Sequence, residues 1–286
     1  MSLSLVRKHL ILYLIMVILT VLSVSPALAQ KSTSDREKAL LAGVGFDQNL
    51  DQQIPLHLEF KDETGQTVHL SQYFGDKPVI LVMAYYECPM LCTLVLNGLL
   101  NGLKKLDLTV GKDFNVITIS IDPLETPAMA AEKKSAYLTF YGRDEAKTGW
   151  HFLTGQNSSI KPLTEAIGFH YVYDDRSDEY AHPSGIVVAT PAGKISRYFY
   201  GVDFPTTDLR LGLVEASANK IGSIVDQILL MCYHYDPDIG RYSLVITNVL
   251  QLAGLVTIAS LSIPIGLMLI REKRNKRATV EVTYPS

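Results

Sequence analysis

The chain has 286 residues, a formal net charge of −3 and only three cysteines. The near-neutral charge gives no support for nucleic-acid binding, which relies on a strongly basic surface. Three cysteines are too few for a small secreted scaffold held together by disulfides. Both ends of the chain carry long apolar runs, so the folded part is expected between them.

The N-terminal segment has the pattern of an export signal. Two basic residues precede an apolar run over residues 10–24, and small residues follow at Ala27 and Ala29. This order is typical of a secretory signal peptide. We therefore predict a signal peptide over residues 1–29, with a retained N-terminal anchor as the alternative, followed by a polar lead-in over residues 30–54.

Residues 55–219 alternate between strand and helix patterns, which predicts a single α/β domain. Strands are expected at 56–60, 67–70, 79–85, 115–121, 150–153, 185–190 and 195–200, and helices at 92–106, 127–140, 160–167 and 209–218. This order gives a central mixed sheet flanked by helices. A cysteine pair at the first strand-to-helix junction makes the predicted fold thioredoxin-like.

The C-terminal part reads as a membrane anchor. A juxtamembrane segment, 220–243, precedes an apolar stretch, 244–270, that is long enough to span a bilayer. The basic tail that follows, 271–286, is expected in the cytoplasm by the positive-inside bias. We therefore predict one C-terminal transmembrane helix. It would place the chain in the bacterial inner (cytoplasmic) membrane, with its domain on the periplasmic side.

Cys88 and Cys92 carry the clearest chemical signal. They lie between a predicted buried strand and a predicted helix, whose first N–H groups and dipole favour thiolates. Residues four apart share one helix face, where two sulfurs can close a disulfide or bind one soft metal ion. A redox-active pair and a metal site therefore both stay open. A purely structural disulfide is less favoured, because so short a loop constrains the unfolded chain little.

Several local matches together resemble the Sco/SenC family. They are the run Cys88-Pro89-Met90-Leu91-Cys92, the strand end Ser120-Ile121-Asp122-Pro123 with Thr126-Pro127 beyond it, and His182 before the strand 186–190. Members of that family are thioredoxin-fold, membrane-anchored proteins that bind copper and help to assemble the copper centre of cytochrome c oxidase. The resemblance covers roughly residues 55–218. It implies that Cys88, Cys92 and His182 bind a copper ion, as Cu(I), Cu(II) or both.

The residue types agree with that implication, because Cu(I) prefers thiolates and imidazole suits either oxidation state. His182 precedes Pro183, just before a strand. In thioredoxin-like folds a cis-proline at such a place lies against the cysteine pair, so we expect His182 to face the site. Asp122 and Glu125 are expected either to support the site through hydrogen bonds or to cap the following helix.

A weaker pair of candidates lies nearer the C-terminus. Cys232 and His234 point the same way in an extended chain, as an accessory copper site would require. The alternative is an interfacial segment, with tyrosines at headgroup level and a thiol packed as a small apolar side chain.

The sequence thus predicts a membrane-anchored copper chaperone that delivers copper to, or matures the copper centre of, a respiratory cytochrome c oxidase. Its expected partner is the copper-bearing oxidase subunit or another copper carrier. The alternative is a membrane-tethered thiol–disulfide oxidoreductase that uses Cys88 and Cys92 to reduce cysteines of an oxidase subunit or a copper carrier. The two functions differ at His182, which a chaperone needs and a reductase does not.

Overall fold

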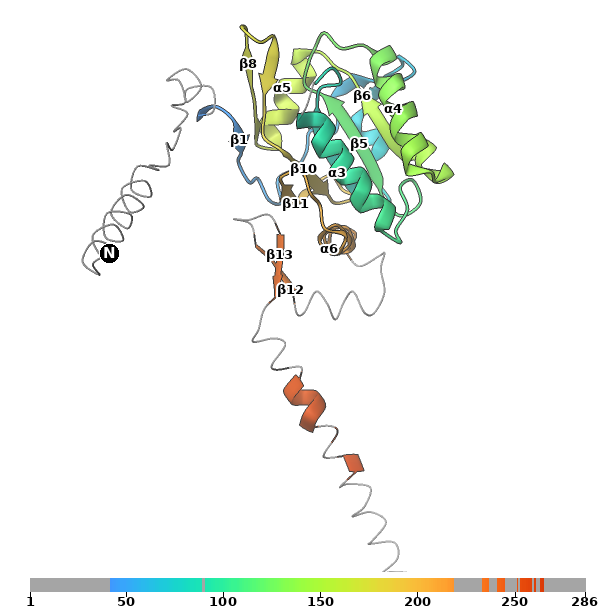
Figure 1. The fold of residues 1–286 in the computed structure, drawn as a ribbon, viewed down its shortest axis with the longest axis vertical. Coiled ribbons are helices and arrows are strands. Elements are labelled where there is room, and N and C mark those ends of the chain that lie inside the picture. Colours follow the sequence, from blue (N-terminus) through green and yellow to red (C-terminus); the bar gives the residue numbers. More distant parts are fainter. Residues whose placement is uncertain are drawn as a thin grey trace, which may run out of the picture. The chain divides into compact units, whose positions relative to one another are not determined.

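A computed structural model describes residues 42–88, 91–218, 233–236, 241–244, 251, 253–258, 260 and 263–264. Its centre is a five-stranded sheet with the strand order β11-β10-β4-β5-β6 (Figure 1). The strands are β4 (Val79–Ala84), β5 (Asn115–Ser120), β6 (Trp150–Leu153), β10 (Gly185–Ala189) and β11 (Ile195–Tyr200). Strands β4, β5 and β6 are parallel, whereas β10 runs antiparallel to both β4 and β11. The sheet is therefore mixed, as predicted.

Strand β4 shows why both faces of this sheet are covered. Its six residues are all apolar and all buried, as expected of a strand packed on both sides. Successive side chains point to opposite faces. Ile80 and Val82 accordingly belong to one core cluster, and Leu81 and Met83 belong to the other.

The helices divide between these two clusters. Residues of α3 (Leu91–Lys105), α4 (Pro127–Tyr141) and α6 (Thr206–Ala216) pack into the first cluster, and residues of α5 (Asn157–Ala166) pack into the second. Trp150, the single tryptophan of the chain, is fully buried in the first cluster. Helices therefore cover both faces of the sheet, in agreement with the predicted α/β class.

Helix α3 lies very close to the loop that precedes α6. A Cβ atom added to Gly98 would lie 1.8 Å from the carbonyl oxygen of Val202. One added to Gly102 would lie 2.8 Å from the carbonyl oxygen of Phe204. Only glycine permits so close a backbone approach, and this contact fixes the position of the helix that carries Cys92.

Short elements surround the sheet. They are the pairs β1 (Gly45–Phe46) with β7 (Phe169–His170), β2 (Glu59–Lys61) with β3 (Thr67–His69), β8 (Val172–Asp174) with β9 (Glu179–Ala181), and β12 (Tyr233–Asp236) with β13 (Arg241–Leu244), and the 3₁₀ helices η1 (Leu70–Tyr73) and η2 (Asp144–Thr148). Strand β1 falls inside the segment predicted as a polar lead-in, and its pairing with β7 joins that segment to the fold.

A largely buried ionic cluster connects the β2–β3 turn to the rest of the domain. The Glu63 carboxylate forms an ion pair with Lys134 of α4 and lies 3.5 Å from Nδ1 of His151. It also accepts a hydrogen bond from the backbone N–H of Phe152 at 3.2 Å. Burial opposes ionisation of Glu63, but the hydrogen bonds with His151 and Lys134 outweigh it and lower the pKa to about 2.

The predicted membrane anchor is contradicted. Within the part of the chain that the structure describes, no helix is long and apolar enough to cross a bilayer. The prediction of a transmembrane helix over 244–270, and the inner-membrane location inferred from it, are therefore wrong. The predicted signal peptide lies outside the described residues.

Candidate metal centre

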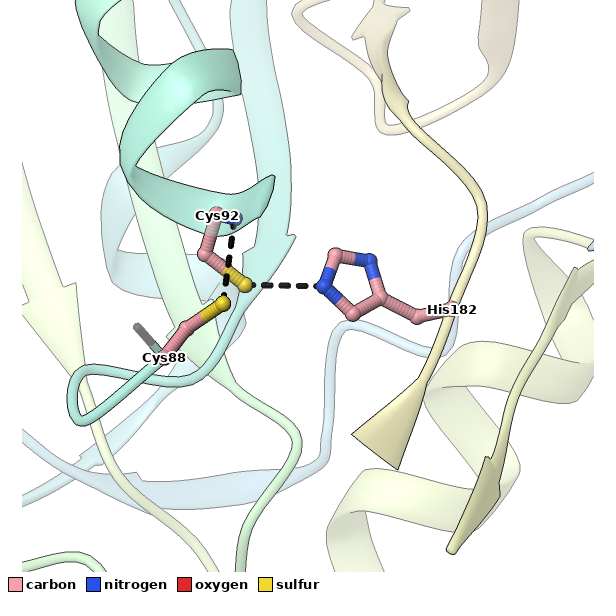
Figure 2. A group of neighbouring side chains, drawn as sticks. All are labelled: Cys88, Cys92 and His182. Atoms are coloured by element: carbon pink, nitrogen blue, oxygen red, sulfur yellow. Dashed lines mark hydrogen bonds between the residues drawn. The ribbon is translucent and has the colours of Figure 1, made fainter. Parts of the chain in front are cut away.

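Cys88, Cys92 and His182 meet at one end of the central sheet. Figure 2 shows the two cysteines at the junction of β4 and α3, facing His182 on the segment between β9 and β10. Their sulfur and nitrogen atoms all lie within 4.8 Å of one another, and all three residues are buried. Because β10 runs antiparallel to β4, its first residue lies near the end of β4, which brings the histidine to the cysteines.

The two cysteines occupy different positions relative to the helix. Cys92 lies in the first turn of α3, whereas Cys88 precedes the helix. The expectation that the two cysteines share one helix face is therefore wrong. Two of the three residues between them, Pro89 and Met90, lie outside the described residues. The backbone N–H of Cys92 donates to Sγ of Cys88 at 3.3 Å. A helix N-terminus therefore faces this sulfur and favours negative charge on it.

The side chain of Cys92 is more deeply buried than that of Cys88. Its Sγ lies 2.9 Å from Nε2 of His182 and accepts the backbone N–H of Tyr85 at 3.3 Å. A hydrogen bond with Cys88 and burial raise the pKa of the Cys92 thiol. Both cysteines are thiols rather than halves of a disulfide. In this state the Cys92 thiol donates its proton towards His182.

The tautomer of His182 follows from its second nitrogen. Nδ1 lies 2.9 Å from the carbonyl oxygen of Pro183. A carbonyl oxygen can only accept, so Nδ1 carries the proton and the Nε2 lone pair faces Cys92. Histidines that bind metals commonly have this arrangement.

Ring contacts complete the placement of His182. Its imidazole stacks on Phe169 at a centroid distance of 6.1 Å and meets the Tyr85 ring edge-on at 6.0 Å. No cis peptide bond occurs among the described residues, so the cis-proline expected at Pro183 is absent. His182 nevertheless faces the cysteines, because its Nδ1 hydrogen bond and these rings orient it.

Glu125 supports the loop that carries the first cysteine. Its carboxylate accepts the backbone N–H of Glu87 at 2.8 Å and the Ser120 hydroxyl at 2.5 Å. Burial raises the pKa of this carboxyl. Helix α4 is capped by Thr126, not by Asp122 or Glu125. Of the two roles considered for Glu125, the structure therefore supports the hydrogen-bonding one.

Tyr85 is a site residue that sequence reasoning missed. Burial and a hydrogen bond with the Cys88 side chain raise the pKa of its phenol. Its place at the end of β4, three residues before Cys88, was the only available signal. An aromatic residue there reads equally well as ordinary core packing.

The accessory pair proposed near the C-terminus is not brought together by any described contact. Cys232 lies outside the described residues. His234 belongs to β12, where its backbone pairs with Ser243 of β13, and its side chain also lies outside the described part. An accessory copper site there stays a prediction.

The donor atoms of the cluster fit a soft metal ion. Two sulfurs and one imidazole nitrogen suit Cu(I), and the imidazole also suits Cu(II). The same two sulfurs can form a disulfide, since only a small movement is needed to join atoms already within 4.8 Å. The geometry therefore permits both functions considered for the chain.

Comparison with known proteins identifies the family. The sequence profile described as SCO1/SenC matches residues 47–209, which is more than half of the chain. A comparison with curated proteins gives no match. A protein from Aquifex aeolicus VF5 to which electron transfer is ascribed has 29% identity and a TM-score of 0.53, with 60% of this chain and 96% of that chain covered.

Two further solved structures are similar. One, also from Aquifex aeolicus VF5 and ascribed to electron transport, has 29% identity and a TM-score of 0.50, covering 59% of this chain and 99% of that chain. The other is Arabidopsis thaliana ScoI with copper bound, at 20% identity and a TM-score of 0.46, covering 56% and 94%. On the match of its sequence to the family profile, the chain belongs to the SCO1/SenC family.

Proposed function

We propose that the domain binds one copper ion through Cys88, Cys92 and His182 and passes it to the copper centre of a cytochrome c oxidase during assembly. The observation that carries the proposal is the convergence of two sulfurs and one imidazole nitrogen within 4.8 Å. Membership of the SCO1/SenC family supports it, because that resemblance implies copper binding and oxidase assembly.

The geometry suits an ion that is held and then released. Two thiolates and one imidazole form a three-coordinate site, which leaves one side of the ion for a ligand from the recipient. Binding displaces the thiol protons, so the Cys92–His182 hydrogen bond gives way to two bonds to the ion. The copper-bearing oxidase subunit, or another copper carrier, is the recipient that this proposal names.

Anaerobic Cu(I) titration of the reduced protein against a competing chelator tests the proposal. We expect one equivalent bound tightly by the wild type, and loss of tight binding in Cys88→Ser, Cys92→Ser and His182→Ala. His170→Ala is the matched control, because the His170 side chain is exposed and pairs with Asp47. Retained tight, stoichiometric binding in all three cluster variants would exclude this site.

A second candidate function, thiol–disulfide exchange, is favoured by the N–H of Cys92 that faces Sγ of Cys88. Such a donor stabilises a thiolate, which is the attacking form in exchange. A pure oxidoreductase would keep most of its exchange rate in His182→Ala. We expect that variant to lose copper, so measuring both properties on it separates the two functions.

A further inference from the structure

Phe46 of β1 is connected to His182 through one other aromatic ring. The Phe46 ring meets the ring of Phe169, in β7, edge-on at a centroid distance of 5.3 Å and an interplanar angle of 77°. Phe169 in turn stacks on the His182 imidazole at 6.1 Å and 28°. Both distances lie in the range in which aromatic pairs attract each other beyond their burial of apolar surface. A residue near the start of the described chain therefore reaches the candidate metal site through a single intermediate.

Phe169 depends on Phe46 for its backbone as well as its ring. The two residues are partners in the register of β1 with β7. Among the described strands, β1 is the only one that pairs with β7. The Phe169 side chain is only 2% exposed, and its ring also packs against Tyr171 at 5.9 Å. The ring that stacks on His182 is thus held in a strand of two residues, and β1 supplies the one strand partner.

The segment that carries Phe46 lies very close to the chain before β7. The backbone N–H of Asp47 donates to the carbonyl oxygen of Gly168 at 2.8 Å. Gly168 has φ of +63°, and a Cβ atom added there would lie 1.9 Å from the carbonyl oxygen of Asp47, so glycine is required. The ion pair of Asp47 with His170 is exposed and contributes little to this contact. Backbone and ring contacts therefore hold β1 in place.

His182 needs support from outside its own segment. The hydrogen bond of its Nδ1 goes to the carbonyl oxygen of the next residue, Pro183, so it orients the ring only relative to that segment. The rings of Phe169 and Tyr85 connect the imidazole to other elements of the fold. Tyr85 follows β4, whereas Phe169 is held by β1. The direction of Nε2 towards Cys92 therefore depends on both rings.

We infer that Phe46 is a positioning residue of the candidate metal site: it holds Phe169 against the His182 imidazole and so keeps Nε2 directed at the cysteines. For copper, the inference rests on the proposed function. For the contact of His182 with Cys92 it does not, because the 2.9 Å approach of Nε2 to Sγ needs no metal.

Phe46→Leu removes the ring and retains an apolar side chain. The first measurement needs no copper: it is the ¹⁵N NMR signal of His182 Nε2 in the reduced protein, which responds to the hydrogen bond from the Cys92 thiol. His182→Ala identifies this signal among those of the seven histidines. We expect Phe46→Leu to move it towards the position of an imidazole nitrogen without a hydrogen bond. Phe46→Tyr, which retains the ring, should restore the wild-type signal.

The second measurement is Cu(I) affinity, determined anaerobically against a competing chelator. Loss of one aromatic contact should weaken binding roughly two- to tenfold in Phe46→Leu. Phe74→Leu is the matched control, because Phe74 is also half-buried against the same core cluster but makes no ring contact with Phe169 or His182. The control should match the wild type in both measurements.

A double variant tests whether Phe46 acts through Phe169. If it does, Phe46→Leu should weaken Cu(I) binding further by less than about twofold in a protein that already carries Phe169→Leu. Two independent residues would instead give losses that multiply. If Phe46→Leu does not fold, Phe46→Met takes its place, since methionine fills a similar space without a ring.

The outcomes separate the two proposals. A Phe46→Leu protein whose Nε2 signal matches that of Phe74→Leu overturns the positioning role, whatever its affinity. Losses that multiply in the double variant overturn it as well. A wild type that binds no copper overturns the proposed function, while the Nε2 signal still decides the role of Phe46.

Discussion

Single side chains fasten the cysteine loop to the sheet, and Glu125 is the best placed of them. It joins the end of β5 to the residue before Cys88. In Glu125→Ala the Glu87 N–H loses its buried acceptor, which typically costs about 1 to 3 kcal/mol. We expect the free energy of unfolding to fall by that amount. Urea titration followed by Trp150 fluorescence measures it, because this single tryptophan is buried in the core.

Two companion variants complete this experiment. Glu125→Gln retains an acceptor for the Glu87 N–H, so its loss should be smaller than that of the alanine variant. Glu132→Ala removes an exposed carboxylate from α4 and should change stability by less than about 0.5 kcal/mol. An alanine variant at position 125 as stable as this control would contradict the supporting role.

The ionic cluster of Glu63, Lys134 and His151 joins the β2–β3 turn to α4 and β6. This makes the packing of these elements sensitive to acid. Glu63 has its pKa lowered from 4.5 to about 2 in the fold. A carboxyl with a lowered pKa contributes stability that is fully present above its unfolded value and is lost as the pH falls through its folded value. We expect the urea midpoint to fall between pH 4.5 and 2. The urea midpoint of Glu63→Gln should fall less over this pH range than that of the wild type. An equal fall in the two proteins would contradict a contribution of Glu63 to the acid sensitivity.

The approach of α3 to the 202–204 loop gives a second prediction at this scale. Replacing a helix-interior glycine by alanine normally stabilises a helix by about 1 kcal/mol. At Gly98 the added methyl would meet the Val202 carbonyl, so we expect net destabilisation of about 1 to 3 kcal/mol. Asn101→Ala, at an exposed position of the same helix, is the control. A stabilised Gly98→Ala protein would show that the loop moves aside.

At the scale of the whole molecule, the candidate metal site joins the β4–α3 junction, which carries Cys88 and Cys92, to the segment between β9 and β10, which carries His182. Metal binding should therefore stabilise the whole domain. At free Cu(I) one hundred times the dissociation constant, a ligand specific for the folded state adds about 2.7 kcal/mol. Anaerobic urea titration, read through Trp150, should show this gain in the wild type and in His170→Ala. We expect no such gain in stability in His182→Ala. A gain of the same size in His182→Ala would contradict ligation by that residue.

Sequence patterns predicted the centre of the fold because its signals are local. The apolar run of β4 and the helical pattern of α3 each lie within one continuous segment. The β1–β7 and β8–β9 pairs were missed, because their two or three residues carry no clear alternation. The equally short β2 and β3 were predicted because each overlaps a longer strand-like run, 56–60 or 67–70. The prediction of a transmembrane helix in the C-terminal apolar stretch was wrong, because it rested on length and hydropathy alone.

The candidate site was predictable in its members but not in its geometry. Residue types and spacing singled out Cys88, Cys92 and His182, and the resemblance assigned them a common role. The contacts of Tyr85 and Glu125 depend on how strand ends and loops meet in three dimensions. The need for glycine at position 98 likewise depends on the loop that lies opposite it.

The antiparallel pairing of β10 with β4 also sets the order in which the cluster can form. Cys92 and His182 are 90 residues apart in the chain. Synthesis at about 5 to 20 residues per second separates their appearance by on the order of 5 to 20 seconds. Throughout that interval the newly made thiols have neither the histidine nor β10 beside them. Whatever oxidant or metal ion they meet first acts on an incomplete site.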